Sequence, residues 1–282
     1  MPTAVHRPGS REIPAQLLHE QHHSSAGRAR CEAFFVDIKA HVLAHGYVLA
    51  GDRFHDVWML PGDEAALRNH LERYIITEDV VVESLTQGRA SFAVPGYDHA
   101  GIVWRDDVEP LMWRTADDFD DATLMFAEWD GVPVCLVSVG ESEANRMWKM
   151  LTSGTRQATD DVFESLRIRE RFPIIGRDLF DSHLAPEAGR NTTAISYTKG
   201  CYLGQEPVAR IDAMGHVNRQ LTRFRIGERL NQVEPANAAE VTSEGIDSEG
   251  RRIGLAVIRL AGIVDGKSPV RVGNTVFEAE VF

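Results

Sequence analysis

The order of strand-like and helix-like segments constrains the fold of this chain more than any other feature. Residues 54–60 (FHDVWML) have the composition of a strand, and Pro61-Gly62-Asp63 ends it and supplies a helix cap. Another strand is predicted over 80–85, and the strand-then-helix order returns at 132–139 (VPVCLVSV), which Gly140 ends. These segments predict two copies of one β-α unit. The apolar positions at helical spacing are Leu67, Leu71 and Tyr74 in the first copy and Ala144, Met147, Trp148 and Leu151 in the second.

A third helix follows the second copy. It is predicted to begin at Asp160 or Asp161, with Glu164 completing a capping box, and to end at Phe172-Pro173. Its inward-facing side chains are expected to be Val162, Phe163 and Leu166.

The character of the chain changes after Gly215. Strand-like runs at 221–226, 253–260 and 276–282 are separated by turn-rich segments such as Glu244-Gly245 and Asp265-Gly266. We therefore expect an α+β fold, with ferredoxin-like β-α repeats and an antiparallel sheet over 1–217, followed by a small C-terminal β-barrel domain over 218–282. The pattern alone also allows a parallel sheet. A length of 282 residues is enough for two domains.

An acidic segment separates the two β-α units. Residues 105–130 hold nine acids against Arg105 and Arg114, and we interpret the segment as a solvated insertion or linker. The whole chain carries 42 acidic and 30 basic side chains, a net charge of −12. This balance argues against a protein whose whole surface grips nucleic acid or anionic lipid.

The three cysteines, Cys31, Cys135 and Cys201, lie far apart and without CxxC spacing, so they indicate neither a disulfide framework nor a thiolate zinc site. Cys135 lies within an apolar run and is expected in the core. The sequence has no apolar run long enough to span a membrane and no secretory pattern at its start. We expect a cytoplasmic monomer that contacts neither membrane nor nucleic acid directly.

Three histidines near the start raise the question of a metal site. His19, His22 and His23 have no accompanying cysteine or carboxylate at a defined spacing, and a polar helix end or loop explains them equally well. No metal site is predicted.

The segment around Cys201 is expected to be a tight loop before a short helix. Pro207 suits the first helical position and Gly215 the position just past the end, which predicts a helix over about 207–214. Gly200 and Gly204 flank the cysteine and permit backbone conformations that other residues avoid.

Two interpretations of this cysteine remain open from local sequence. Lys199 and the helix N-terminus would favour the thiolate, which is the form that attacks electrophiles or binds metal. Free cysteine, however, is among the residues most often buried and then acts as a small hydrophobe.

The region that contains Cys201 is basic. Residues 167–225 hold ten basic and six acidic side chains, so they carry +4 against −16 for the rest of the chain. Such a region suits an anionic ligand, and an ordinary surface ion-pair network is the alternative.

Residues 199–206 spell KGCYLGQE, and 207–210 continue with PVAR. This run resembles the signature of YgfZ-like proteins, which are relatives of the glycine-cleavage T-protein. Further segments that resemble the family are LRIRERFP at 166–173, Gly176-Arg177-Asp178, Ala185-Pro186-Glu187, and CEAFF at 31–35 with Leu18-His19 before it. The resemblance spans most of the chain.

The resemblance implies a tetrahydrofolate-binding protein in which α+β lobes and a C-terminal β-barrel surround a central cavity. It also implies a role in assembling or repairing iron–sulfur clusters, and thereby in tRNA modification. Cys201 would be the functional cysteine, with Lys199 as the second reactive-site residue. The expected cofactor is tetrahydrofolate or a one-carbon derivative, and the expected partners are iron–sulfur assembly proteins or their client enzymes. The residues that the resemblance assigns to the folate are Tyr202, Gln205, Glu206, Arg210, Arg169 and Glu170.

Two main hypotheses follow. The first is a folate-binding assembly factor with little or no turnover and with Cys201 at the rim of the folate site. The second is an aminomethyltransferase of the T-protein kind, which needs an acidic pair to steer proton transfer. T-proteins carry paired aspartates where this chain reads Ala44-His45-Gly46-Tyr47, and residues 21–25 (QHHSS) replace a Thr-Asn-Asp-like run of the relatives. We therefore favour the first hypothesis, with a scaffold that has lost its ligand as a third alternative.

Overall fold

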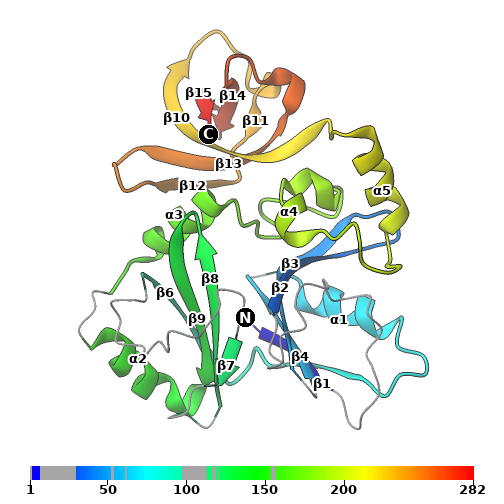
Figure 1. Ribbon diagram of the computed structural model, residues 1–282. Coiled ribbons are helices and arrows are strands. Elements are labelled where there is room, and N and C mark those ends of the chain that lie inside the picture. The colour runs from blue at the N-terminus through cyan, green and yellow to red at the C-terminus, as the bar shows by residue number, and fades with distance from the viewer. Residues whose placement is uncertain are drawn as a thin grey trace. The chain divides into compact units, whose positions relative to one another are not determined.

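The computed structural model describes residues 2–6, 30–51, 54–60, 62–96, 113–115, 119, 121–153 and 157–282. The chain divides into two compact units, Met1–Ala33 with Gly46–Gln157 and Phe34–His45 with Ala158–Phe282. Figure 1 follows the chain through both by colour. These two units do not correspond to the domains expected over 1–217 and 218–282, and the boundary at residue 218 stays a prediction.

One five-stranded sheet has the strand order β2-β3-β4-β1-β5, and β4 pairs antiparallel with both β1 and β3. Helix α1 (Glu64–Glu72) begins where the sequence predicts, because the Asp63 carboxylate accepts a hydrogen bond from the N–H of Ala66 at 2.8 Å. Leu67 is buried as expected, but Tyr74 lies beyond the helix end and is 50% exposed, so it was wrongly assigned to the apolar face. The strands are β1 (Pro2–His6), β2 (Arg30–Val36), β3 (Val42–Ala50), β4 (Phe54–Met59) and β5 (Val81–Ser84).

A four-stranded antiparallel sheet has the order β6-β9-β8-β7. Helix α2 (Ala144–Thr152) buries Met147 and Leu151 in the same core cluster as Cys135, which confirms the predicted burial of that cysteine. Trp148 is 39% exposed and stacks on Phe92 at a centroid distance of 5.9 Å, so it covers the edge of this core instead of filling it. The strands are β6 (Arg89–Pro95), β7 (Trp113–Thr115), β8 (Ala122–Trp129) and β9 (Val132–Gly140), and the 3-10 turn η3 (Glu141–Glu143) precedes α2.

The interpretation of 105–130 as a solvated insertion is wrong for 122–129. This stretch is strand β8, which pairs along its whole length with β9 and buries the side chains of Leu124, Met125 and Phe126. The acids counted in the segment flank these apolar residues, and their number concealed the strand. Residues 105–112, 116–118 and 120 lie outside the described residues, as do the histidines of 19–23 and the segment 21–25.

Helix α3 (Asp160–Glu170) begins at the predicted residue. The predicted capping box is wrong: Thr159 is the N-cap residue, and the Glu164 carboxylate instead binds the guanidinium of Arg167 at 2.5 Å. Leu166 is buried as predicted, whereas Val162 is 43% exposed. The side of the helix that carries Leu166 therefore faces inward, and the side that carries Val162 faces solvent.

A curled six-stranded sheet with the order β11-β14-β15-β10-β13-β12 follows at the C-terminal end (Figure 1). Glu244-Gly245, expected as a turn, lies within strand β12 (Ser243–Ile246). A Cβ atom on Gly245 would lie 3.2 Å from Ile168 Cδ1, so the glycine serves close packing of this strand on α3. The other elements are β10 (Arg219–Leu230), η5 (Pro235–Asn237), β11 (Ala239–Glu240), β13 (Arg252–Arg259), η6 (Leu260–Gly262), β14 (Lys267–Val272) and β15 (Thr275–Val281).

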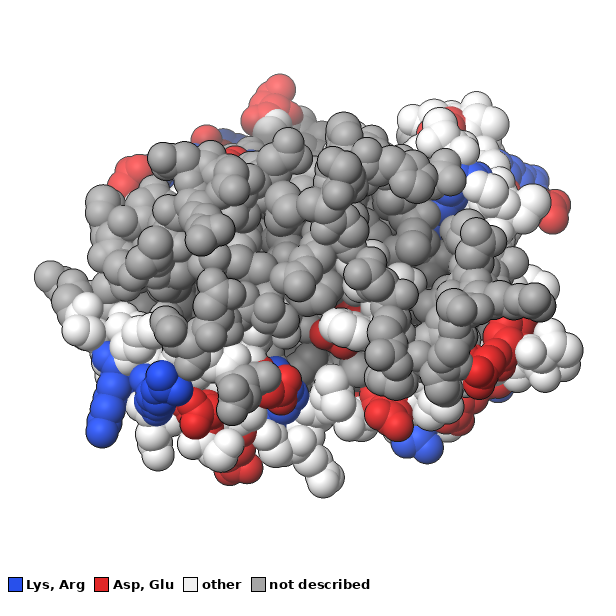
Figure 2. Space-filling view, turned by 60° about the horizontal axis from the view of Figure 1, so that its bottom comes forward, with Lys and Arg blue, Asp and Glu red and all other residues white. Residues whose placement is uncertain are grey.

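The chain therefore has a mixed α+β fold with a curled C-terminal sheet. The ferredoxin-like repeats and the closed barrel stay predictions. In the part of the chain that the structure describes, no helix combines the length and the apolar composition needed to cross a membrane. On the face shown in Figure 2, basic and acidic side chains of the described residues stand next to one another. The cytoplasmic location stays a prediction.

Candidate functional site

The Cys201 side chain is exposed in a loop between α4 (Asn191–Ala194) and α5 (Gln205–Met214). Helix α5 starts two residues earlier than Pro207 indicated, because Gly204 takes the N-cap position with φ at +79° and the N–H of Gln205 donates to the carbonyl of Tyr202 at 3.2 Å. The helix ends at Gly215, as predicted. Of the two interpretations of the cysteine, the buried hydrophobe is wrong.

Gly204 rests directly on the turn between β2 and β3. A Cβ atom at this position would lie 2.6 Å from the carbonyl oxygen of Asp37 and 3.2 Å from the Cα of Ala40. Glycine is thus required twice, for its left-handed backbone and for this close approach. The residue at the start of α5 is thus held against a turn from a distant part of the sequence.

That turn is itself rigidly hydrogen-bonded. The Asp37 Oδ1 atom accepts hydrogen bonds from the backbone N–H groups of Lys39 and His41, both at 2.8 Å, and its Oδ2 atom lies 3.1 Å from the His41 ring. Burial alone would raise the pKa of Asp37, but the hydrogen bonds from His41 and Lys39 outweigh it and lower that pKa. The carboxylate therefore stays charged and holds the support under Gly204.

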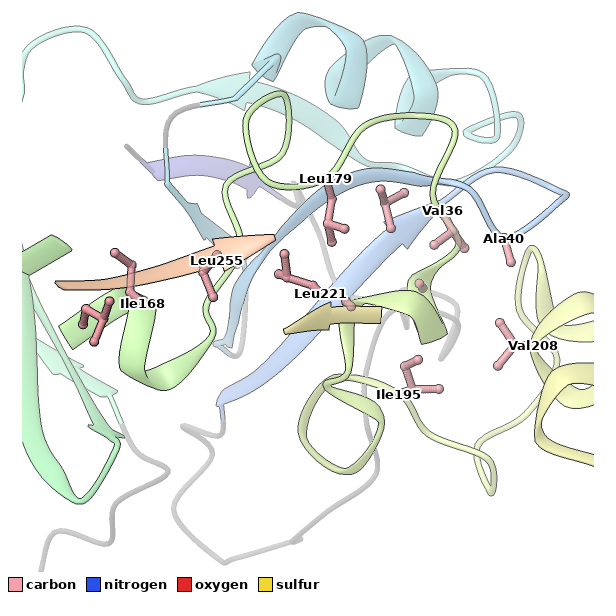
Figure 3. Close-up of a cluster of buried hydrophobic side chains, with 12 residues drawn as sticks. Val36, Ala40, Ile168, Leu179, Ile195, Val208, Leu221 and Leu255 are labelled. Carbon is pink, nitrogen blue, oxygen red and sulfur yellow. The ribbon is translucent and has the colours of Figure 1, made fainter. Parts of the chain in front are cut away.

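Helix α5 is anchored on its inner side by Val208. This residue is 2% exposed and packs in a core cluster with Ala40, Ile195 and Leu221. Figure 3 shows Val208 pointing from α5 into that cluster. The opposite side of the helix leaves Glu206 and Arg210 exposed, while Gln205 is half-buried. Val208 therefore fixes the position of α5, whose N-terminal end follows the Cys201 loop.

Lys199 and Tyr202 are brought together across the loop. The Lys199 ammonium lies 4.2 Å from the centre of the Tyr202 ring, a cation–π contact, and its backbone N–H donates to Ser196 Oγ at 3.1 Å. Burial and then the neighbouring Tyr197 raise the pKa of Tyr202, so its phenol stays protonated at neutral pH. The lysine, predicted as a reactive-site residue, thus has a defined contact with a residue predicted for the folate.

Arg169 and Glu170, also predicted for the folate, lie at the C-terminal end of α3. The Glu170 carboxylate pairs with the guanidinium of Arg190 at 2.7 Å, and Arg190 also donates to the Glu170 carbonyl at 2.6 Å. The carbonyl of Arg169 accepts a hydrogen bond from Arg223. The predicted folate residues therefore form two groups, one in the Cys201 loop with α5 and one at the end of α3.

The basic region of 167–225 is in large part an ion-pair network. Arg167 pairs with Asp178, Arg190 with Glu170, and Arg219 with Glu187. Ion pairs, the alternative that the sequence left open, are therefore present, but Arg167–Asp178 and Arg190–Glu170 are buried and do not form the surface network that was expected. An anionic ligand would have to be held by arginines outside the network.

Sequence reasoning missed Asp56, a buried acid in strand β4. The side chain is 8% exposed, and burial raises its pKa from 3.8 to about 6, an effect that Arg89 reduces and Asp121 reinforces. Its signal in the sequence is a carboxylate in the middle of FHDVWML, an otherwise apolar strand. Within the described ranges, no cluster of three or more histidine, cysteine or acidic side chains could hold a metal ion.

Comparisons with known proteins point to one family. No protein-family model matches the chain. A tRNA-modifying protein YgfZ from Edwardsiella ictaluri is 32% identical over 142 residues, 49% of this chain and 41% of the relative. YgfZ of Colwellia psychrerythraea is 33% identical over 98 residues (34% of this chain, 29% of the relative), and that of Hamiltonella defensa 26% over 196 residues (67% and 56%). The matches thus span about a third to a half of the length of these relatives.

The fold is similar to that of a solved structure over nearly the whole chain. The crystal structure of the glycine cleavage system aminomethyltransferase T from Bartonella henselae aligns with 99% of this chain and 82% of its own, at a TM-score of 0.78 and 15% identity. At this identity the likeness concerns the fold alone. In sequence this chain is therefore similar to proteins named YgfZ over part of its length, and in fold it is similar to an aminomethyltransferase of the glycine cleavage system.

Proposed function

We propose that this protein binds tetrahydrofolate and assists the assembly or repair of iron–sulfur clusters, and through it enzymes that modify tRNA. The observation that carries the proposal is the exposed Cys201 in a loop that Gly204 holds against the Asp37 turn. The names of the relatives support the link to tRNA modification, and the shared fold supports folate binding.

The residues present are chemically suited to a folate. A reduced pterin carries several N–H donors, which the side-chain oxygens of Gln205 and Glu206 in the Cys201-containing unit can accept. The glutamyl tail is anionic, and the Cys201-containing unit has arginines at the end of α3. When bound, the folate would carry the one-carbon group. Lys199, Tyr202, Gln205, Glu206, Arg210, Arg169 and Glu170 stay proposed contacts.

In this proposal the Cys201 thiol contacts an iron–sulfur cluster or a partner protein. An exposed thiol can reach either without any change in the core, because Val208 and Gly204 anchor the loop from behind. The cluster is cargo here, and the other ligands to it would come from the partner.

Replacing Cys201 with alanine should abolish the activity of a client iron–sulfur enzyme in cells. The variant should stay folded, because the Cys201 side chain is exposed and contributes nothing to the core. The measurement is the enzyme's specific activity in cells that express the variant as their only copy. The C135A variant is a control for loss of a thiol in the core. Unchanged enzyme activity with C201A would overturn the role of the thiol.

Folate binding has its own test. Tetrahydrofolate should raise the melting temperature of the purified protein, since a ligand that binds only the folded state stabilises it by mass action. C201A should bind tetrahydrofolate as the wild type does. The absence of both heat in titration calorimetry and a thermal shift would contradict folate binding.

A second candidate function is one-carbon transfer of the aminomethyltransferase kind. Asp56 favours it, because an acid whose pKa is raised to about 6 can accept and return a proton near neutral pH. Formation of methylene-tetrahydrofolate from an aminomethyl donor would distinguish turnover from binding alone. Activity that D56N abolishes would establish this second function.

A further inference from the structure

Arg171 is a half-buried arginine whose charge has no ion-pair partner among the residues that the structure describes. Its Nε atom is buried and has no hydrogen-bond acceptor, and no ion pair within 157–282 includes its guanidinium. Burial, followed by the positive charges of Arg190 and Arg223, lowers the pKa of Arg171. An arginine in such surroundings destabilises the folded state unless an anion joins it.

The backbone of Arg171 adds to this cost. The residue adopts left-handed dihedral angles, φ 57° and ψ 36°, just past the end of α3. Its N–H donates to Ile168 and that of Phe172 donates to Arg167, both at 3.0 Å, which is the arrangement that usually carries glycine. A cation does suit a helix C-terminus, but that preference does not require burial without an acceptor.

A second donor converges on the same place. The Cβ that glycine lacks at position 189 would lie 3.0 Å from Arg171 Nη1 and 2.9 Å from Gln220 Nε2. The guanidinium and the amide thus approach one point beside Gly189.

The neighbouring charges do not neutralise Arg171. Glu170 is the acid among them, and its carboxylate binds Arg190 at 2.7 Å. Arg223 donates to the carbonyl oxygen of Arg169 and to an oxygen of Phe282. Among the described residues, the Arg171 guanidinium beside Gly189 therefore has no ion-pair partner of its own.

We propose that Arg171, with Gln220, forms a binding site for the carboxylate group of a small molecule. A planar carboxylate can accept the parallel N–H groups of a guanidinium and a further N–H from a side-chain amide. The carboxylate can come from a free dicarboxylic acid or from the glutamyl end of a folate. In the second case the site deepens the proposed function and rests on it.

The test compares carboxylate probes with and without the rest of a folate. Glutarate, 4-aminobenzoylglutamate and tetrahydrofolate are titrated calorimetrically into wild type, R171M and R229M, with 4-aminobenzamide as the probe that lacks carboxylates. R229M removes an equal charge from an exposed position on the same strand as Gln220. We expect at least one carboxylate probe to bind the wild type and R229M equally, and R171M at least about tenfold more weakly. The amide probe should not bind at this site.

Stability without ligand gives a readout that a merely structural arginine would not produce. R171M should melt at the same or a higher temperature than the wild type, because it removes a buried unpaired charge, yet its melting should not respond to the probe. R171K keeps the charge, loses the planar fork and should also bind more weakly. Should R171M unfold, R171K carries the comparison.

The outcomes separate this site from the proposed function. If tetrahydrofolate binds wild type and R171M equally and neither other carboxylate binds through Arg171, folate binding stands and the carboxylate site is overturned. If glutarate or 4-aminobenzoylglutamate binds through Arg171 while tetrahydrofolate does not bind at all, the site stands and folate binding fails. Dependence of all three probes on Arg171 supports both.

Discussion

At the scale of single residues, Asp56 is an acidic side chain at a buried position. Its neighbours in strand β4, Val57 and Trp58, are buried and apolar, and the acid is buried with them. The folded protein therefore holds a proton on Asp56 up to a pH of about 6, whereas the unfolded chain releases it near 3.8. Between these values the unfolded state binds fewer protons, so stability must fall as the pH rises.

D56N should remove this loss. We expect the variant to be more stable than the wild type by up to about 3 kcal/mol at pH 7.5 and by almost nothing at pH 4, since two pKa units correspond to about 3 kcal/mol. Urea unfolding across this pH range measures the difference. E83Q, at an exposed position of the adjacent strand β5, is the control and should show no such trend. A D56N advantage independent of pH would contradict the raised pKa.

At the scale of elements, α5 and the loop before it depend on Gly204 and not on Gly200. Both glycines flank Cys201 in the sequence, and both were expected to permit bends. A Cβ at Gly204 would collide with the Asp37 carbonyl, whereas one at Gly200 would meet nothing within 4 Å. Sequence could identify the loop but could not say which glycine is required, because the Asp37 turn is more than 160 residues away in the chain.

G204A should destabilise the protein by about 2 to 4 kcal/mol, from left-handed strain and the clash with the turn, while G200A should be neutral. Chemical denaturation gives the two free energies of unfolding. The rate at which a thiol reagent modifies Cys201 should also change in G204A alone, since that variant displaces the loop. Equal behaviour of both variants would rule out the contact with the turn as the support of the site.

At the scale of the whole molecule, buried ionic contacts join α3 to the C-terminal sheet. Arg167 and Asp178 are both fully buried and pair at 2.7 Å, and Arg167 also donates to Ser243 Oγ of β12 at 2.6 Å. Ser243 in turn donates to the Asp178 carboxylate at 2.5 Å. These contacts join residues on both sides of position 218 within one compact unit.

R167M should cost about 3 to 5 kcal/mol, because it leaves the Asp178 carboxylate buried without its cation. R177M is the matched control: its guanidinium also binds Glu164, at 2.5 Å, but is 42% exposed, and its loss should cost less than about 1 kcal/mol. Free energies of unfolding in urea give the comparison. Equal costs for the two variants would show that burial does not govern this network.

Patterns that depend on neighbours in sequence could be predicted for this protein. The Asp63 cap, the start of α3, the end of α5 and the apolar run around Cys135 follow from local propensity and periodicity, which operate over one or two helical turns. Tertiary structure alone decided that Glu164 pairs with Arg167, that β8 is buried, and that the Arg171 Nε atom is buried without a hydrogen-bond acceptor. These outcomes depend on which side chains are removed from solvent and on contacts between residues that are distant in the sequence. Neither can be inferred from composition or local periodicity.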